Sequence, residues 1–132
     1  MKQTLILRET NKLKFTDGWE DDWHIESGDK VLAGKLLPIF EAYLKSLQKK
    51  GVAKSTFNRH KSACHAIGGY IIDRVFHYQW DKYKESEQGE DILLRYLDGY
   101  DGPLIHQDNE SWQREVDTTS RKLYTFIKNL DP

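Results

Sequence analysis

The sequence has few of the residues that cross-link a chain or interrupt its regular structure. It holds one cysteine, one methionine and three prolines among 132 residues. Because Cys64 has no second cysteine to bond, no disulfide can form within the chain, and a reducing compartment is the default. The apolar run at residues 5–7 is too short for a secretory signal, and no run approaches the roughly 20 residues of a membrane span. We therefore expect a cytoplasmic protein without membrane contact.

The motifs of the common enzyme classes are also missing. The sequence has no P-loop, no dinucleotide fingerprint and no nucleophile elbow. The acid pairs at 21–22 and 90–91 could serve acid–base catalysis, but adjacent acids in acidic segments are far more often solvated surface. His60 and Cys64 could share a metal ion, yet on a helix His65 points about 100° away. We predict no catalytic residue, metal, cofactor or small-molecule substrate.

Periodic apolar positions predict four helices. They run from about residue 31 or 36 to 50, from 55 to 78, near 90–98, and from 109 or 111 to 129, with apolar residues recurring every three or four positions. The predicted buried positions are Leu36, Leu37, Phe40, Tyr43, Leu44, Leu47; Phe57, Cys64, Ile67, Ile71, Val75, Tyr78; Ile92, Leu93, Tyr96, Leu97; and Trp112, Val116, Thr119, Leu123, Phe126, Ile127, Leu130. Four helices with short connections predict one all-α domain over residues 30–132.

Residues 1–29 are predicted to form an extension to this domain. Residues 1–16 could fold as a short hairpin around Thr10 and Asn11. The next stretch is acidic and is predicted to be a loop held in place by Trp19 and Trp23.

Two local features of the second predicted helix bear on function. It is predicted to begin at Ser55, a favourable N-cap, and it has Gly68 and Gly69 in its interior. Each glycine costs about 1 kcal/mol relative to alanine. Close approach of another backbone, or a break in the helix, is therefore expected at this point.

The aromatic residues allow two interpretations. Six of them could be stacking platforms for single-stranded nucleic acid: Trp19, Trp23, Trp80, Tyr83, Trp112 and Tyr124. We favour packing in a small helical core, because each lies beside apolar neighbours or on a helical stripe.

Positive charge is concentrated in the middle of the chain. Residues 30–80 carry nine lysines and arginines against two acids, whereas residues 81–132 carry seven against twelve. No acidic residue occurs between Ala42 and Ile72. This asymmetry indicates an anionic partner. In the alternative, the acidic ends fold over the basic middle and neutralise it.

The segment FEAYLKSLQKKGVAKSTFNRHKSACHAIGGYI, residues 40–71, resembles the N-terminal core-binding domain of tyrosine recombinases, which has a SAM-like fold. The shared elements are an apolar helix (Phe40, Tyr43, Leu44, Leu47), a Lys/Gly linker (Lys49, Lys50, Gly51), a cap (Ser55, Thr56) and a second helix with alternating basic and apolar positions. The resemblance implies a four-helix SAM-like domain that clamps one side of double-stranded DNA.

Carried over by position, the resemblance implicates the linker and the start of the second helix in DNA binding. With two further residues on the polar face of that helix, the predicted DNA-binding set is Lys50, Lys54, Ser55, Thr56, Asn58, Arg59, Lys61 and His65. No His-x-x-Arg element of a recombinase catalytic domain is present, so we expect a non-catalytic DNA-associated module. The alternative is a protein–protein interaction domain whose basic middle binds an acidic partner or another copy of the chain.

Overall fold

A computed structural model describes residues 13–23, 30–84, 86–97, 102–105 and 108–130, and these residues form helices without any strand. The elements are α2 (Trp19–Asp22), α3 (Lys30–Lys50), α4 (Lys54–Ile72), a π-helical turn η1 (Asp73–His77), α5 (Gly89–Tyr96) and α6 (Glu110–Lys128). The all-α prediction is therefore confirmed, with five α-helices in the described part of the chain. The hairpin prediction falls mainly on residues 1–12, outside the described residues.

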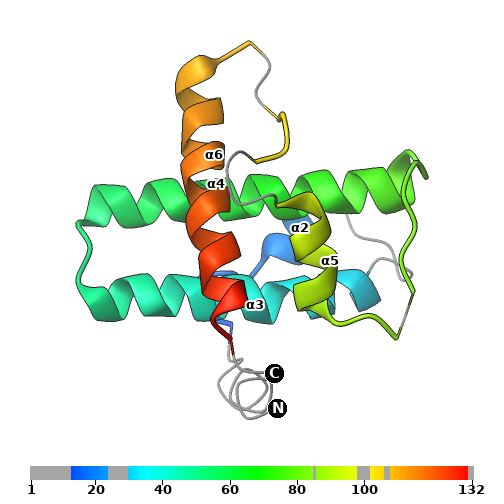
Figure 1. The fold of residues 1–132 in the computed structure, drawn as a ribbon, viewed down its shortest axis with the longest axis horizontal. Helices are drawn as coiled ribbons and strands as arrows, with labels where there is room; N and C mark the ends of the chain where they lie inside the picture. Colours follow the sequence, from blue (N-terminus) through cyan, green and yellow to red (C-terminus); the bar gives the residue numbers. More distant parts are fainter. Residues whose placement is uncertain (1–12, 24–29, 85, 98–101, 106–107, 131–132) are drawn as a thin grey trace.

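The two longest elements, α3 and α4, lie side by side and antiparallel, and α6 crosses both of them (Figure 1). The predicted apolar face of α3 is buried between these helices: Phe40, Leu36 and Leu44 have no exposed surface. Burial of each such side chain contributes roughly 1.5–3 kcal/mol. Pro38 lies inside α3, so the helix is the longer of the two forms that the sequence allowed.

The start of α4 differs from the prediction. Ala53 is the N-cap residue and makes no side-chain cap hydrogen bond, so Ser55 lies in the first turn instead. At its other end α4 continues directly into η1, where the Tyr78 N–H donates to the Asp73 carbonyl oxygen at 2.8 Å. Single π-helical turns inside helices are frequent at functional sites.

The acidic segment that was predicted as a loop contains the short helix α2. The two tryptophans that were expected to hold it in place are both buried. Trp23 lies against Gly68 and Gly69 of α4 and donates its indole N–H to the His65 carbonyl oxygen at 3.1 Å. The two glycines thus admit a side chain rather than another backbone, and α4 does not break there.

A buried carboxylate attaches the residues before α2 to α3. One oxygen of Glu41, Oε1, accepts hydrogen bonds from the backbone N–H groups of Lys14, Phe15 and Thr16 at 2.8, 2.9 and 3.1 Å. The hydroxyl of Thr16 donates to the same oxygen at 3.1 Å. Both Glu41 and Thr16 have no exposed surface. Residues 14–16 are therefore part of the packed domain.

The helix α5 approaches α3 closely at Gly89. A Cβ atom at this position would lie less than 3.0 Å from the carbonyl group of Lys35. The Lys35 ammonium group donates to the Glu87 carbonyl oxygen at 2.6 Å, across the same contact. This is a close contact between two backbones, of the kind that was expected at Gly68 and Gly69. It lies instead at Gly89, a position that was not predicted from the sequence.

Candidate functional site

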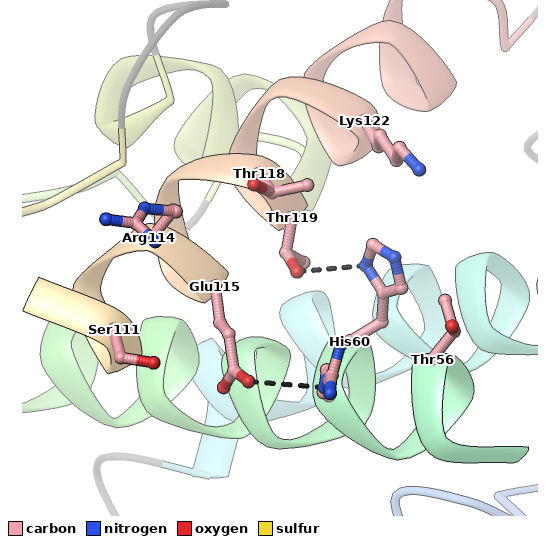
Figure 2. A pocket seen from close by; sticks show the side chains of 9 residues that line it. Thr56, His60, Ser111, Arg114, Glu115, Thr118, Thr119 and Lys122 are labelled. Carbon is pink, nitrogen blue, oxygen red and sulfur yellow. Dashed lines mark hydrogen bonds and ion pairs between the residues drawn. The ribbon is translucent and has the colours of Figure 1, made fainter.

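A groove with positive charge lies between the N-terminal half of α4 and the outer face of α6. Its volume is about 370 Å³. Three cationic side chains line it, Arg59, Arg114 and Lys122, with Glu115 as the single carboxylate. Four hydroxyl groups, those of Thr56, Ser111, Thr118 and Thr119, are also in its wall (Figure 2). Cationic groups and hydroxyl donors that lie close together can bind an oxyanion.

Helical spacing places the α6 side chains of the groove. Ser111, Arg114, Thr118 and Lys122 follow one another at intervals of three or four residues and therefore share one face of the helix. The helix start is fixed by Asn109, whose side chain accepts a hydrogen bond from the Trp112 N–H at 3.1 Å. On its opposite face, buried Val116 and Leu123 attach α6 to the core.

Arg59 and Glu115 form an ion pair across the groove, with Arg59 Nε 3.6 Å from Glu115 Oε1. The Arg59 side chain is 66% exposed and that of Glu115 is 35% exposed. Exposed pairs of this kind contribute about 0–1 kcal/mol, so the guanidinium group can exchange this carboxylate for another anion at little cost.

His60 lies at the base of the groove and is 5% exposed. Its Nδ1 is 2.9 Å from the Thr119 hydroxyl (Figure 2) and 3.2 Å from the Tyr43 hydroxyl, so it connects α6 to α3 through α4. Burial lowers the pKa of His60, and the nearby Lys122 ammonium group lowers it further. Burial also raises the pKa of the Tyr43 hydroxyl. The network is therefore neutral at neutral pH.

The eight residues that were predicted to bind DNA do not form one surface. Thr56 and Arg59 line the α4–α6 groove. Asn58, Lys61 and His65 line a second hollow on the other side of α4, next to Trp19. Lys50, Lys54 and Ser55 are exposed where α3 passes into α4.

His65 contacts two residues of α2. Its Nε2 is 3.1 Å from the Asp22 carboxylate, and its ring meets the Trp19 ring edge to face at 5.1 Å. Together with the Arg59–Glu115 pair, this contact means that both acidic ends of the chain reach the basic middle. Neutralisation is partial, because Lys50 and Lys54 remain exposed.

The groove includes residues that the sequence interpretation missed, namely Ser111, Arg114, Thr118 and Lys122 of α6. Their common spacing on the polar face of a well-marked helix was visible in the sequence. The signal was overlooked because residues 81–132 are acidic as a whole, which hid a local cluster of positive charge.

The three potential metal ligands of α4, namely His60, Cys64 and His65, have different neighbours. His60 faces Tyr43 and Thr119, whereas His65 faces Asp22. Cys64 has no exposed surface, and burial raises the pKa of its thiol, so it behaves as a small apolar residue. Within the described ranges, no three His, Cys, Asp or Glu side chains are placed to hold a metal ion.

The packing interpretation of the aromatic residues is right for some of them and wrong for others. Trp19 and Trp23 are buried, and Tyr83 and Tyr124 pack against the core. Trp80 and Trp112 are instead exposed, with more than half of their surface open to solvent. Tyr78, which was predicted as a buried position of the second helix, is also exposed, so that prediction is wrong.

Comparison with protein-family models, with curated proteins and with solved structures gave no match. In the described part of the chain, no helix has the length and apolar character needed to cross a membrane.

Proposed function

We propose that this chain is a non-catalytic, cytoplasmic module that binds the phosphate backbone of double-stranded DNA. In this proposal the helices form a SAM-like domain of the kind found in the core-binding region of tyrosine recombinases, without recombinase chemistry. The observation that supports it best is the α4–α6 groove, which is lined by Arg59, Arg114 and Lys122 together with four hydroxyl-bearing side chains. Backbone phosphates are bound by such donors without regard to base sequence.

The contact surface is revised relative to the sequence prediction. The groove supplies Thr56 and Arg59 from the predicted set and adds Arg114 and Lys122 from α6. Lys50 and Lys54 would extend the surface along the turn between α3 and α4, where both are exposed. Asn58, Lys61 and His65 lie on the other flank of α4 and are left out of the proposed interface.

The test is the salt dependence of binding to a fluorescent 20-base-pair duplex, followed by anisotropy. The wild type is compared with the triple variant Arg59→Ala, Arg114→Ala, Lys122→Ala. Each cation that contacts a phosphate releases condensed counterions, so the slope of log K against log salt should fall by about 1 per removed contact. We expect a reduction of about 3 in the slope, and an affinity at least tenfold lower at 50 mM salt.

The matched control removes three charges elsewhere, through Lys30→Ala, Lys82→Ala and Lys84→Ala. All three residues are exposed and lie outside the groove. The control has the same net charge as the groove variant, so a non-specific charge effect would weaken both proteins equally. Equal weakening, or no binding by the wild type at low salt, contradicts the proposal. The second result would favour the alternative function, binding of an acidic protein partner.

A further inference from the structure

Two exposed aromatic rings stack on each other just after the π-helical turn. The ring centroids of Tyr78 and Trp80 are 4.6 Å apart and the rings are within 16° of parallel. Tyr78 is 57% exposed and Trp80 is 66% exposed. Large aromatic side chains are normally buried in a domain of this size, and exposed ones gather at contact surfaces.

Hydrogen bonds and an ion pair of neighbouring residues position the pair. The Arg74 carbonyl oxygen accepts hydrogen bonds from the N–H groups of Trp80 and Asp81, at 2.9 and 3.1 Å. The Arg74 guanidinium group binds both oxygens of the Asp81 carboxylate, at 2.7 and 3.3 Å. Tyr96 of α5 donates its hydroxyl to the same carboxylate at 2.6 Å. The hydrogen bond from Arg74, followed by that from Tyr96, lowers the pKa of Asp81.

The backbone between the two rings takes an unusual conformation. Gln79 has φ of +57°, the only described residue other than glycine with a positive φ. A non-glycine residue in this region costs about 1 kcal/mol or more and is retained where the surroundings impose it. The arrangement thus fixes two large apolar side chains at the surface before any partner is present, which lowers the entropic cost of binding.

These rings form one wall of a hollow with a volume of about 570 Å³. Leu104 and Ile105 contribute aliphatic surface, and Leu104 is 60% exposed. The carboxylates of Asp22 and Asp73 also line it, and each contacts a histidine of the same hollow, Asp22 with His65 and Asp73 with His77. Its one guanidinium group, that of Arg74, is already neutralised by Asp81. With histidines counted as neutral, the hollow therefore carries a net negative charge.

We infer that this hollow binds a segment of a partner protein in which an arginine or lysine lies next to aliphatic side chains. The aliphatic part would lie on Leu104 and Ile105. The Arg74 guanidinium group already lies 5.3 Å from the centroid of the Trp80 ring, which stacks on Tyr78. The cationic group would therefore lie over the face of Tyr78 that is turned away from Trp80, near the carboxylates of Asp22 and Asp73. Cation–π contact and charge complementarity both favour that occupant.

Single-stranded nucleic acid is the competing occupant, because bases stack on exposed aromatic rings. Proteins that bind it combine the aromatic rings with a positively charged groove that follows the phosphates. The hollow beside Trp80 instead has a net negative charge, and Asp22 and Asp73 would repel phosphates. The surface is also separate from the proposed DNA site, which is lined by Thr56, Arg59 and His60 at the other end of α4.

The test is an NMR titration of the full chain with three probes, observed at the four tryptophan indole N–H signals. The probes are an acetylated tetrapeptide alternating leucine and arginine, its leucine–glutamate counterpart, and an oligothymidine of eight nucleotides. We expect the arginine peptide to shift the Trp80 signal in a saturable way and to bind at least tenfold more tightly than the glutamate peptide. The signals of buried Trp19 and exposed Trp112 should respond less.

Two variants make the result specific. Trp80→Ala should weaken binding of the arginine peptide by about fivefold, because it removes apolar area and the ring on which Tyr78 stacks. Trp112→Ala, the matched control, removes a similarly exposed tryptophan from the crevice beside α6 and should leave the affinity unchanged. The inference is overturned if oligothymidine binds at Trp80 more tightly than the arginine peptide. It is also overturned if neither peptide shifts Trp80, or if both variants weaken binding equally. Duplex binding by the α4–α6 groove is measured separately, so failure of either proposal leaves the other standing.

Discussion

The indole ring of Trp23 occupies the space that a side chain at Gly68 would need. A Cβ atom on Gly68 would lie less than 3.0 Å from Cζ2 and Cη2 of Trp23. Trp23 is 5% exposed, and its indole N–H donates to the His65 carbonyl oxygen on the same helix. Glycine at position 68 lowers the helix propensity of α4. Because it has no side chain, it leaves room for Trp23 to be buried against α4.

This relationship predicts that Gly68→Ala destabilises the fold. Alanine favours helix over glycine by about 1 kcal/mol, so propensity alone would raise the free energy of unfolding. Overpacking against a buried indole typically costs about 1–3 kcal/mol and should exceed that gain. We expect a net loss of up to about 2 kcal/mol in the free energy of unfolding, measured by urea unfolding.

Gly34→Ala is the matched control for this substitution. Gly34 lies inside α3, and a Cβ atom there would meet no other atom within 4 Å. Its replacement should raise the free energy of unfolding by about 0.5–1 kcal/mol. If the two variants are stabilised equally, Trp23 does not occupy the space at Gly68.

The helices were predictable because each buries one periodic face. The α6 stripe of Val116, Thr119, Leu123 and Ile127 is buried as expected, and the predicted end of α3 at Lys50 is correct. Trp112 fits the same period but is exposed, because the first turn of α6 extends past the edge of the core. Periodicity indicates which face is buried, but it does not indicate where the neighbouring helix stops.

The candidate site was predictable only in part, because it depends on which elements meet. The sequence places Lys61 and Arg59 two positions apart, yet α2 packs on one flank of α4 and α6 on the other. Two cations that looked like one cluster are therefore separated. Conversely, Arg59 and Lys122 are 63 positions apart in the chain and line the same groove because α6 crosses α4. No local pattern encodes that crossing.

A second prediction concerns the buried carboxylate of Glu41. Its Oε1 accepts three backbone N–H groups, so Glu41→Ala leaves three donors without their partner in a buried environment. Hydrogen bonds to a charged group contribute about 1.5–3 kcal/mol each when measured singly, and they are not additive here. We expect a loss of about 2–4 kcal/mol and faster amide hydrogen exchange at residues 14–16.

Glu41→Gln distinguishes the hydrogen bonds from the general effect of an altered core. The amide oxygen of glutamine can still accept from the same N–H groups, so protection at residues 14–16 should be retained in large part. Asp108 is an exposed acid outside the helices. Its replacement by alanine should change neither the free energy of unfolding nor the hydrogen exchange at residues 14–16. Unchanged exchange in Glu41→Ala would mean that residues 14–16 are held by other contacts.

A third prediction follows from His60, whose pKa is lowered by burial and by Lys122. Since the unfolded chain has the ordinary histidine pKa of about 6.5, it binds the extra proton before the folded protein does as the pH falls. The stability contributed by neutral His60 is therefore fully present above about pH 6.5. It is lost progressively as the pH falls from there toward the folded pKa. Wild type should lose more unfolding free energy between pH 7.5 and pH 5.0 than His60→Gln, up to about 1.4 kcal/mol per pH unit in that window.

Lys122→Gln isolates the electrostatic part of the same effect. Removing the ammonium group should raise the pKa of His60 toward its ordinary value without touching the hydrogen bonds of Nδ1 to Thr119 and Tyr43. Imidazole chemical shifts in an NMR titration measure the pKa of His60 directly. A His60 that titrates at or above 6.5 in the wild type would mean that its ring is hydrated. The base of the groove would then be open to water rather than closed by the Tyr43–His60–Thr119 network.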